Sequence, residues 1–204
     1  MIVFGFAVGP LQANCYLVGD SSTRKAAVID PGGEEHRILT ECAKRQLKVE
    51  KILLTHAHPD HIGAAFDLRR TTRAELCCHR DETAVLQAVL QTGSGTSVEA
   101  DHLLEDGEQI EVGNLHIQVI HTPGHTPGGV CYLARPCLFT GDTLFRRSIG
   151  RTDFPGGSHQ QLLNSITSHL LHLDDDLIVL PGHMGKTTLG EEKRENPFLK
   201  TPLR

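Results

Sequence analysis

The sequence predicts an α/β fold in which two mixed β-sheets pack face to face and helices cover the outside, an αββα sandwich. Three observations predict it. Short apolar, β-branched segments separated by Gly, Pro, Asn and Asp indicate strands. Each half of the chain has strands first and helices after them. The 204 residues, 39% of them hydrophobic, suffice for one substantial core, so we expect a single domain over residues 1–204.

The first half begins with several strands before its first helix. An amphipathic helix is expected from about Glu34 to Arg45, because Ile38, Leu39 and Cys42 fall on one face. The predicted strands of this half are IVFGFAV (2–8), CYLVG (15–19), AAVID (26–30), KILLT (51–55) and AELCCH (74–79).

Two more helices are expected before the middle of the chain. One follows the segment HAHPDHIG and includes Phe66 and Leu68, and the other covers DETAVLQAVLQ at 81–91. The segment QTGSGTS (91–97) has the composition of a surface loop. In the helix at 81–91 we expect four residues to face mostly inward: Ala84, Leu86, Ala88 and Leu90.

The second half repeats the order of strands and then a helix. A helix is predicted over 158–173, because its apolar residues Leu162, Leu163, Ile166 and Leu170 share one side. The predicted strands are EQIEV (108–112), LHIQVIH (115–121), GVCYLA (129–134), CLFTGD (137–142) and LIVLPGH (177–183).

Charge and hydropathy exclude several classes of partner. The net charge of −5 does not provide the broad basic face that nucleic-acid binding usually needs. No apolar run approaches the ~20 residues of a membrane helix. The N-terminus lacks the basic start of a signal peptide. We therefore expect a cytoplasmic protein without nucleic-acid or membrane partners.

Six cysteines occur without a C-x-x-C pair, so we expect buried, reduced thiols and no cysteine nucleophile. They are Cys15, Cys42, Cys77, Cys78, Cys131 and Cys137.

One short stretch, HAHPDH, has the composition of a metal site. Imidazole and carboxylate groups are good ligands for zinc and similar cations. A loop just past a strand can turn alternate residues toward one centre. His56 and His58 can then bind one ion, while Asp60 and His61 reach a second.

Three further side chains complete the expected site. His125, Asp142 and His183 each follow an apolar strand, and rigid strands that end in ligands produce a well-defined site. Nearby glycines permit the backbone shapes that close loops around metal.

The remaining polar residues are expected to have structural roles. His116 and His121 lie along a predicted strand, where we expect core positions, and His121 could support the ring of His125. Asp30, in DPGG, is expected to cap a turn near the site. Six other histidines are expected to be solvated or capping: His36, His79, His102, His159, His169 and His172.

HAHPDH resembles the H-x-H-x-D-H motif of the metallo-β-lactamase superfamily, and the later ligand positions match too. Within it the chain is similar to the glyoxalase II-like branch, and most similar to the short, single-domain hydroxyacylglutathione hydrolases. The segments that carry this resemblance are GPLQANCYLV, THAHPDHIGA, HTPGHTPGG, GDTLFRRSIGRTDFPGG and PGHMGKTTLGEEKRENPFL.

The resemblance implies two divalent metal ions, zinc first, with iron or manganese as alternatives. One ion would be held by His56, His58 and His125, and the other by Asp60, His61 and His183. Asp142 would bridge the two.

The resemblance also implies a reaction. Two cations about 3.5–4 Å apart can share a hydroxide that attacks a thioester such as S-lactoylglutathione. Asp60 would orient the water in addition to binding metal. The leaving thiol, with a reference pKa near 8.5, needs little help from an acid.

Substrate recognition rests on a smaller set of residues. Arg151, in the segment GRTDFPGG after the bridging aspartate, is expected to bind a substrate carboxylate, and a purely structural arginine is the alternative. Only about 21 residues follow His183, too few for the helical C-terminal domain with which larger glyoxalases II bind glutathione. The acyl and thiol groups therefore stay open.

Two other functions remain as alternatives. A glutathione persulfide dioxygenase of the same fold would use a single iron on His56, His125 and Asp142. A module that binds metal without turnover is the other. A β-lactamase is less consistent with the second ligand set, which in those enzymes often contains a cysteine.

Overall fold

A computed structural model describes residues 1–91 and 99–200 of the chain. Two six-stranded sheets make up its centre, with strand orders β1-β2-β3-β4-β5-β6 and β14-β13-β10-β9-β8-β7. A short antiparallel pair, β11 (Leu144–Phe145) and β12 (Ser148–Ile149), stands apart from both. Both sheets mix parallel and antiparallel pairs, as expected.

The first sheet uses residues 2–104. Its strands β1 to β3 pair antiparallel, and β3 to β6 pair parallel. The strands are β1 (Ile2–Val8), β2 (Ala13–Gly19), β3 (Lys25–Ile29), β4 (Lys48–Leu53), β5 (Glu75–His79) and β6 (His102–Leu104).

The second sheet uses residues 109–188. Its neighbours pair antiparallel except β10 and β13, which run parallel. The strands are β7 (Gln109–Val112), β8 (Leu115–His121), β9 (Val130–Ala134), β10 (Cys137–Gly141), β13 (Ile178–Pro181) and β14 (Thr187–Thr188).

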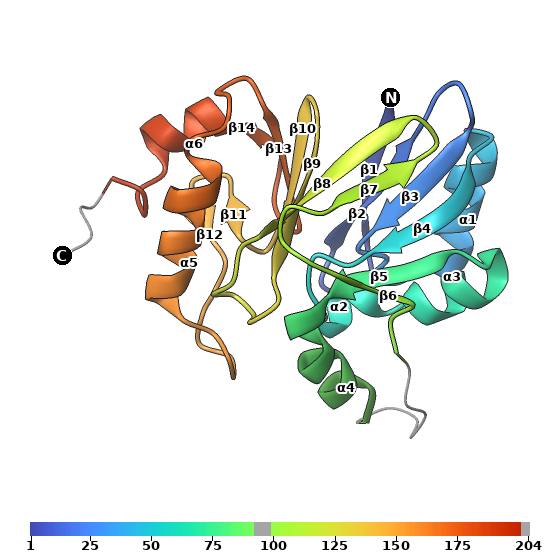
Figure 1. Ribbon diagram of the computed structural model, residues 1–204, viewed down its shortest axis with the longest axis horizontal. Coiled ribbons are helices and arrows are strands. Elements are labelled where there is room, and N and C mark those ends of the chain that lie inside the picture. Colours follow the sequence, from blue (N-terminus) through green and yellow to red (C-terminus); the bar gives the residue numbers. More distant parts are fainter. Residues whose placement is uncertain (92–98, 201–204) are drawn as a thin grey trace.

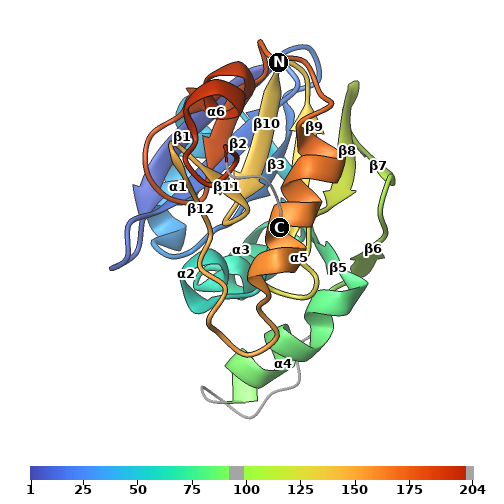
Figure 2. The same cartoon turned by 90° about the vertical axis from the view of Figure 1, so that its left-hand side faces the viewer.

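Helices cover the outer face of each sheet (Figure 1). On the first sheet these are α1 (Glu35–Lys44) and α3 (Ala65–Thr72). On the second they are α5 (His159–Ser165), which continues as a π-helical segment (Ile166–Leu170), and α6 (Leu189–Glu195). Of two more helices, α4 (Thr83–Gln91) lies at the lower end of the view and α2 (Pro59–Ile62) lies above it, as Figure 2 also shows.

Three hydrophobic clusters separate these four layers. The first lies between α1, α3 and the first sheet, the second between the sheets, and the third between the second sheet and α5. Consecutive residues of a central strand point to opposite faces, so in β4 Ile52 enters the first cluster and Leu53 the second. Because both faces are buried, such strands appear as continuous apolar runs. The αββα sandwich is confirmed.

Most predicted elements are present, with a few differences. In α4, Leu86 is buried as expected, but Ala84 and Ala88 are exposed, so the inward face was assigned wrongly there. The side chain of Leu90 and most of the predicted loop at 91–97 lie outside the described residues. Several short elements were not predicted, among them β6, β11, β12, β14, α2 and α6. Of α6, a short polar helix, only Leu189, Gly190 and Glu192 are buried.

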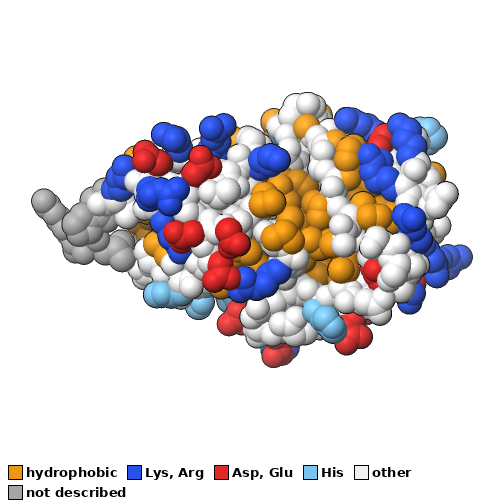
Figure 3. Space-filling view, turned by 90° about the horizontal axis from the view of Figure 1, so that it is seen from above, with side chains coloured by type: hydrophobic (Ala, Val, Ile, Leu, Met, Phe, Trp, Pro, Cys, Tyr) orange, Lys and Arg blue, Asp and Glu red, His pale blue; other side chains and the backbone are white. Residues whose placement is uncertain are grey.

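The surface and the thiols agree with a folded, reduced chain. All six cysteines are buried and free. Within the described residues, no helix combines the length and apolar character that crossing a bilayer requires. Seen from above, hydrophobic side chains gather across the middle of one face, with charged side chains on either side (Figure 3).

Candidate metal centre

The predicted ligands lie in four segments, each just after a strand, and two of them, Asp60 and His61, lie in the short helix α2. The HAHPDH loop follows β4 of the first sheet, whereas His125, Asp142 and His183 follow β8, β10 and β13 of the second. Buried tyrosines hold two of these segments at their start. Tyr132 donates to the Leu54 carbonyl and Tyr16 to the Pro181 carbonyl, each at 2.7 Å.

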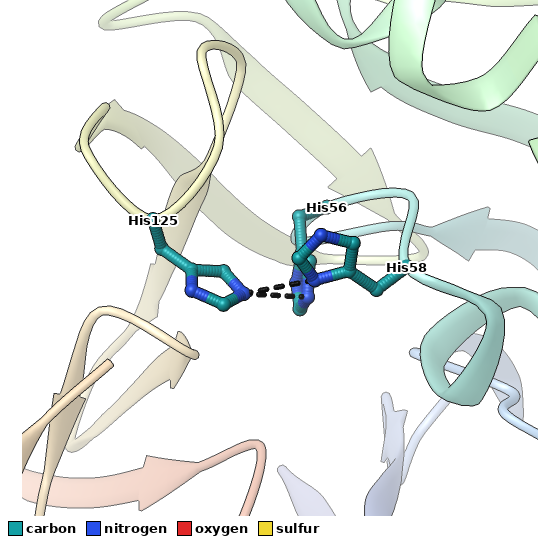
Figure 4. A group of neighbouring side chains, drawn as sticks. All are labelled: His56, His58 and His125. Atoms are coloured by element: carbon teal, nitrogen blue, oxygen red, sulfur yellow. Dashed lines mark hydrogen bonds between the residues drawn. The ribbon is translucent and has the colours of Figure 1, made fainter. Parts of the chain in front are cut away.

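Three histidines form the first potential metal-binding group. His125 Nε2 lies 3.3 Å from His56 Nε2 and 3.0 Å from His58 Nδ1, so the three rings converge (Figure 4). Two nitrogens bound to one tetrahedral zinc are about 3.3–3.4 Å apart. Burial lowers the pKa of all three, to about 4 for His58. The rings are therefore neutral at pH 7, the form that binds a cation.

Asp60, His61 and His183 form the second group. His183 Nε2 lies 3.1 Å from Asp60 Oδ2, and His61 Nε2 lies 3.7 Å from the same oxygen. Burial alone would lower the pKa of His61, but nearby carboxylates, Asp30 foremost, raise it to about 9. The hydrogen bond to Asp60 raises the pKa of His183. Without a cation, the carboxylates of this group therefore favour the protonated form of His61.

Asp142 lies between the two groups. Its Oδ1 is 3.5 Å from His61 Nε2, and its Oδ2 is 3.6 Å from His125 Nε2 and 3.7 Å from His183 Nε2. One carboxylate therefore reaches ligands of both groups. All seven residues predicted from the sequence as ligands come together in one place.

Unsatisfied polar atoms indicate that these residues suit cations. His61 Nε2 and Asp142 Oδ1 are buried without a hydrogen-bond partner, which is costly unless a ligand satisfies them. A Cβ on Gly182 would lie 2.4 Å from Asp142 Oδ1 and 2.7 Å from His61 Cε1. The glycine therefore leaves space beside two donor atoms. The donor set of imidazoles and carboxylates fits zinc, iron or manganese.

The Asp30 side chain, expected to cap a turn, instead holds a ligand. It accepts a hydrogen bond from His61 Nδ1 at 2.9 Å and from the Thr55 amide and hydroxyl at 2.7 and 2.6 Å. Nε2 of His61 is thereby directed toward Asp60 and Asp142. Asp30 is buried and its partner His61 is 31 residues away, so no local sequence pattern indicates this role.

The hydrogen-bond partner of the His125 ring is a backbone carbonyl and not the expected His121. His125 Nδ1 donates to the Arg151 carbonyl at 2.6 Å, whereas His121 Nε2 lies 3.0 Å from the Pro127 carbonyl. The prediction that His121 supports His125 is wrong. His116, also expected in the core, is exposed.

Glu82 is a buried carboxylate that the sequence analysis missed. It is fully buried and accepts from the Ala57 amide and the Gly128 amide, each at 2.9 Å. Ala57 lies between two proposed ligands, and Gly128 is three residues beyond a third. Glu82 therefore ties the loops of the first metal group together. No local pattern marks it, because its partners are 25 and 46 residues away.

A third group of possible donors has the wrong geometry. His79, Asp81 and His121 offer donor atoms within 4.8 Å of one another. The two rings are stacked, 4.0 Å apart and only 17° from parallel. The lone pairs of stacked rings lie side by side rather than converging. His79 uses its Nδ1 to cap the 3-10 helix at Arg80–Glu82, which agrees with the expected capping role.

The metal groups open into a cavity of 1020 Å3 between α4 and the segment 151–155. Arg151 lines it, as the prediction requires. Its guanidinium, however, already forms two hydrogen bonds to Asp153, at 2.7 and 2.6 Å, and lies over the Phe154 ring. The role of Arg151 in substrate binding stays a prediction.

Comparisons with known proteins agree with this architecture. A family model described as the metallo-beta-lactamase superfamily matches residues 8–183. Hydroxyacylglutathione hydrolase GloC of Haemophilus influenzae is 38% identical over 204 residues, which cover 95% of this chain and 96% of that protein.

Three crystal structures share the fold at substantial identity. The BLEG-1 B3 metallo-beta-lactamase has a TM-score of 0.90 and 39% identity, covering 98% of this chain and 100% of that one. ETHE1 from Myxococcus xanthus has 0.85 and 36%, covering 97% and 84%. TTHA1623 in a di-iron-bound form has 0.84 and 36%, covering 96% and 100%.

Proposed function

Because this chain belongs to the metallo-beta-lactamase superfamily, we propose that it is a two-metal hydrolase that cleaves thioesters, with S-lactoylglutathione the first substrate to test. The observation that carries this proposal is the position of Asp142, whose carboxylate reaches the first group at His125 and the second group at His61 and His183. The likeness to a hydroxyacylglutathione hydrolase supports the choice of substrate. The di-iron-bound neighbour supports two ions.

The proposed ligands fall into the two groups that the distances between their donor atoms define. His56, His58 and His125 would hold one ion, Asp60, His61 and His183 would hold the other, and Asp142 would serve both. When bound, the ions would lower the pKa of a coordinated water to about 7 and polarise the substrate carbonyl. Zinc is the first metal to test, and iron and manganese are the alternatives.

Asp60 is the proposed group for orienting the water. Although burial opposes ionisation, the hydrogen bond from His183 holds the pKa of Asp60 down to about 2. The carboxylate is therefore an acceptor throughout the neutral range. It lines the cavity together with His58 and His125 of the first group.

The buried thiols favour this mechanism over a covalent one. Burial raises the pKa of Cys131 to about 11 and of Cys77 and Cys78 to about 12, which removes their thiolates at neutral pH. The thiol product needs no protein acid, because its reference pKa is near 8.5.

The test combines metal analysis with thiol release from S-lactoylglutathione. We expect about two ions per chain and release of glutathione. His125→Ala should lose bound metal and glutathione release. His116→Ala, which changes an exposed histidine of β8 away from the proposed ligands, should keep bound metal and glutathione release. Two ions without cleavage of any thioester would refute the proposed reaction. Cleavage of a chromogenic β-lactam instead would assign the chain the activity named for its structural neighbour.

A second candidate function rests on a subset of the ligands. His56, His125 and Asp142 would offer two imidazoles and a carboxylate to one ion. His125 Nε2 lies 3.3 Å from His56 Nε2 and 3.6 Å from Asp142 Oδ2. This is the ligand set of non-heme iron oxygenases. One iron per chain and oxygen uptake with glutathione persulfide would establish the dioxygenase. A metal-bound protein inactive in every assay would be a binding module.

A further inference from the structure

The cavity over the metal groups has walls that are mostly apolar. Five proposed ligands form its floor: His58, Asp60, His125, Asp142 and His183. On one side α4 contributes Ala84, Val85, Ala88 and Val89. On the other side stand Phe145, Ile149, Phe154 and Pro155. At 1020 Å3 the cavity holds a group far larger than a lactoyl unit.

Exposed hydrophobic side chains concentrate at this cavity. Among the described residues, six large hydrophobics are clearly exposed, and three of them line it: Leu11 at 67%, Met184 at 59% and Phe154 at 41%. These three come from different loops, so the clustering is a property of the fold and not of one segment. Clustered exposed apolar side chains in a concave site indicate a ligand that covers them.

Positive charge is scarce in the same cavity. Arg151 is the one Lys or Arg among its described lining residues, and Asp153 occupies its guanidinium with two hydrogen bonds. The other polar wall residue, Ser148, is uncharged. A carboxylate on the far part of a ligand would thus lack an unpaired cation to bind. The walls of the cavity therefore suit a hydrocarbon group of a ligand better than a charged group.

We infer that the thioester cleaved by this chain carries an extended apolar group, which lies between α4 and the segment 151–155 while the scissile carbonyl faces the metal groups. This inference rests on the proposed thioester hydrolysis and names its substrate class. An apolar group in this position leaves water for hydrocarbon walls, and this transfer favours binding. Each added methylene should tighten binding by about three- to fourfold while the cavity has room.

The test measures binding with a series of S-alkyl glutathiones from methyl to octyl, thioethers that cannot be hydrolysed. Calorimetry on the metal-loaded protein should show Kd falling about three- to fourfold per methylene, with a negative heat-capacity change. The matched variants are Ala88→Glu and Gln87→Glu. Both place a new carboxylate on exposed positions of α4, but only position 88 lines the cavity. Ala88→Glu should flatten the chain-length dependence, and Gln87→Glu should keep it.

The outcomes separate this inference from the proposed function. Cleavage of S-lactoylglutathione with a Kd that does not change with chain length would overturn the inference and leave the function standing. A steep chain-length dependence without cleavage of any thioester would overturn the function and keep the apolar site. Equal slopes for Ala88→Glu and Gln87→Glu would place the hydrocarbon elsewhere and overturn the inference.

Discussion

Replacing Glu82 by alanine should weaken both the fold and the first metal group. The carboxylate is 0% exposed and accepts from two buried amides, Ala57 and Gly128. Its removal leaves both amides unsatisfied, at about 1–3 kcal/mol each. Burial raises the pKa of Glu82, so part of this loss is offset by no longer burying a charge. We expect a net loss of about 2–4 kcal/mol, which lowers Tm by roughly 5–15 °C for a chain of this size.

The effect on metal binding is what distinguishes a positioning residue from a structural one. Glu82 fixes the loops of His56, His58 and His125 relative to one another, so zinc affinity should fall by about 10–100-fold. Glu192→Ala is the matched control. Glu192 is also 0% exposed and accepts from the Arg147 amide and the side chains of Thr187 and Asn196.

Urea unfolding and competition with a zinc chelator measure the two quantities for each variant. Glu192→Ala should lose comparable stability and keep its zinc affinity, because the residues that donate hydrogen bonds to Glu192 neither are proposed ligands nor adjoin one. If both variants lose zinc affinity equally, the loss follows from general destabilisation. In that case, or if Glu82→Ala costs less than about 1 kcal/mol, the reasoning about Glu82 is refuted.

Three further predictions concern the metal groups and the cavity. Gly182→Ala should abolish binding of the proposed second ion, because its Cβ would lie 2.4 Å from Asp142 Oδ1, whereas Gly185→Ala, with nothing within 4 Å, should bind both ions in metal analysis. Despite burial, carboxylates raise the pKa of His61 to about 9, so the second ion must displace a proton and its affinity should fall about tenfold per pH unit below 9. Burial lowers the pKa of His58 to about 4, so the first ion should bind without proton release at pH 7.5. Calorimetry in two buffers of different ionisation enthalpy measures the protons released by each ion. Equal proton release for the two ions would contradict these two expectations. Arg151→Ala should raise KM more than it lowers kcat if the side chain leaves Asp153 to bind substrate, and an unchanged KM in steady-state kinetics would end that role.

The convergence of the seven proposed ligands could be predicted from the sequence, because they are either close together in the chain or at strand ends. HAHPDH concentrates four donors in six residues, and the other three each follow a buried strand. The alternation of apolar runs and turns likewise indicated the two sheets. These are local signals, and the structure confirms the fold that they predicted.

What could not be predicted depends on contacts between distant residues. Asp30 reaches His61 across 31 residues, and Glu82 reaches Gly128 across 46, without any pattern in the intervening sequence. The face of α4 was misjudged because it borders an open cavity, where apolar residues such as Ala88 are exposed. The π-helical end of the helix at 158–173 depends on hydrogen-bond spacing, which apolar periodicity does not reveal.

The two sheets come from separate stretches of the chain, and each proposed metal group draws on both. The first sheet supplies His56, His58, Asp60 and His61, and the second supplies His125, Asp142 and His183. A bound ion would therefore act as a cross-link between the halves, favouring their docking by mass action. Neither half alone holds a complete set of donors. A nascent or half-folded chain would consequently have no hydrolytic activity, and metal loading would report that assembly of the sandwich is complete.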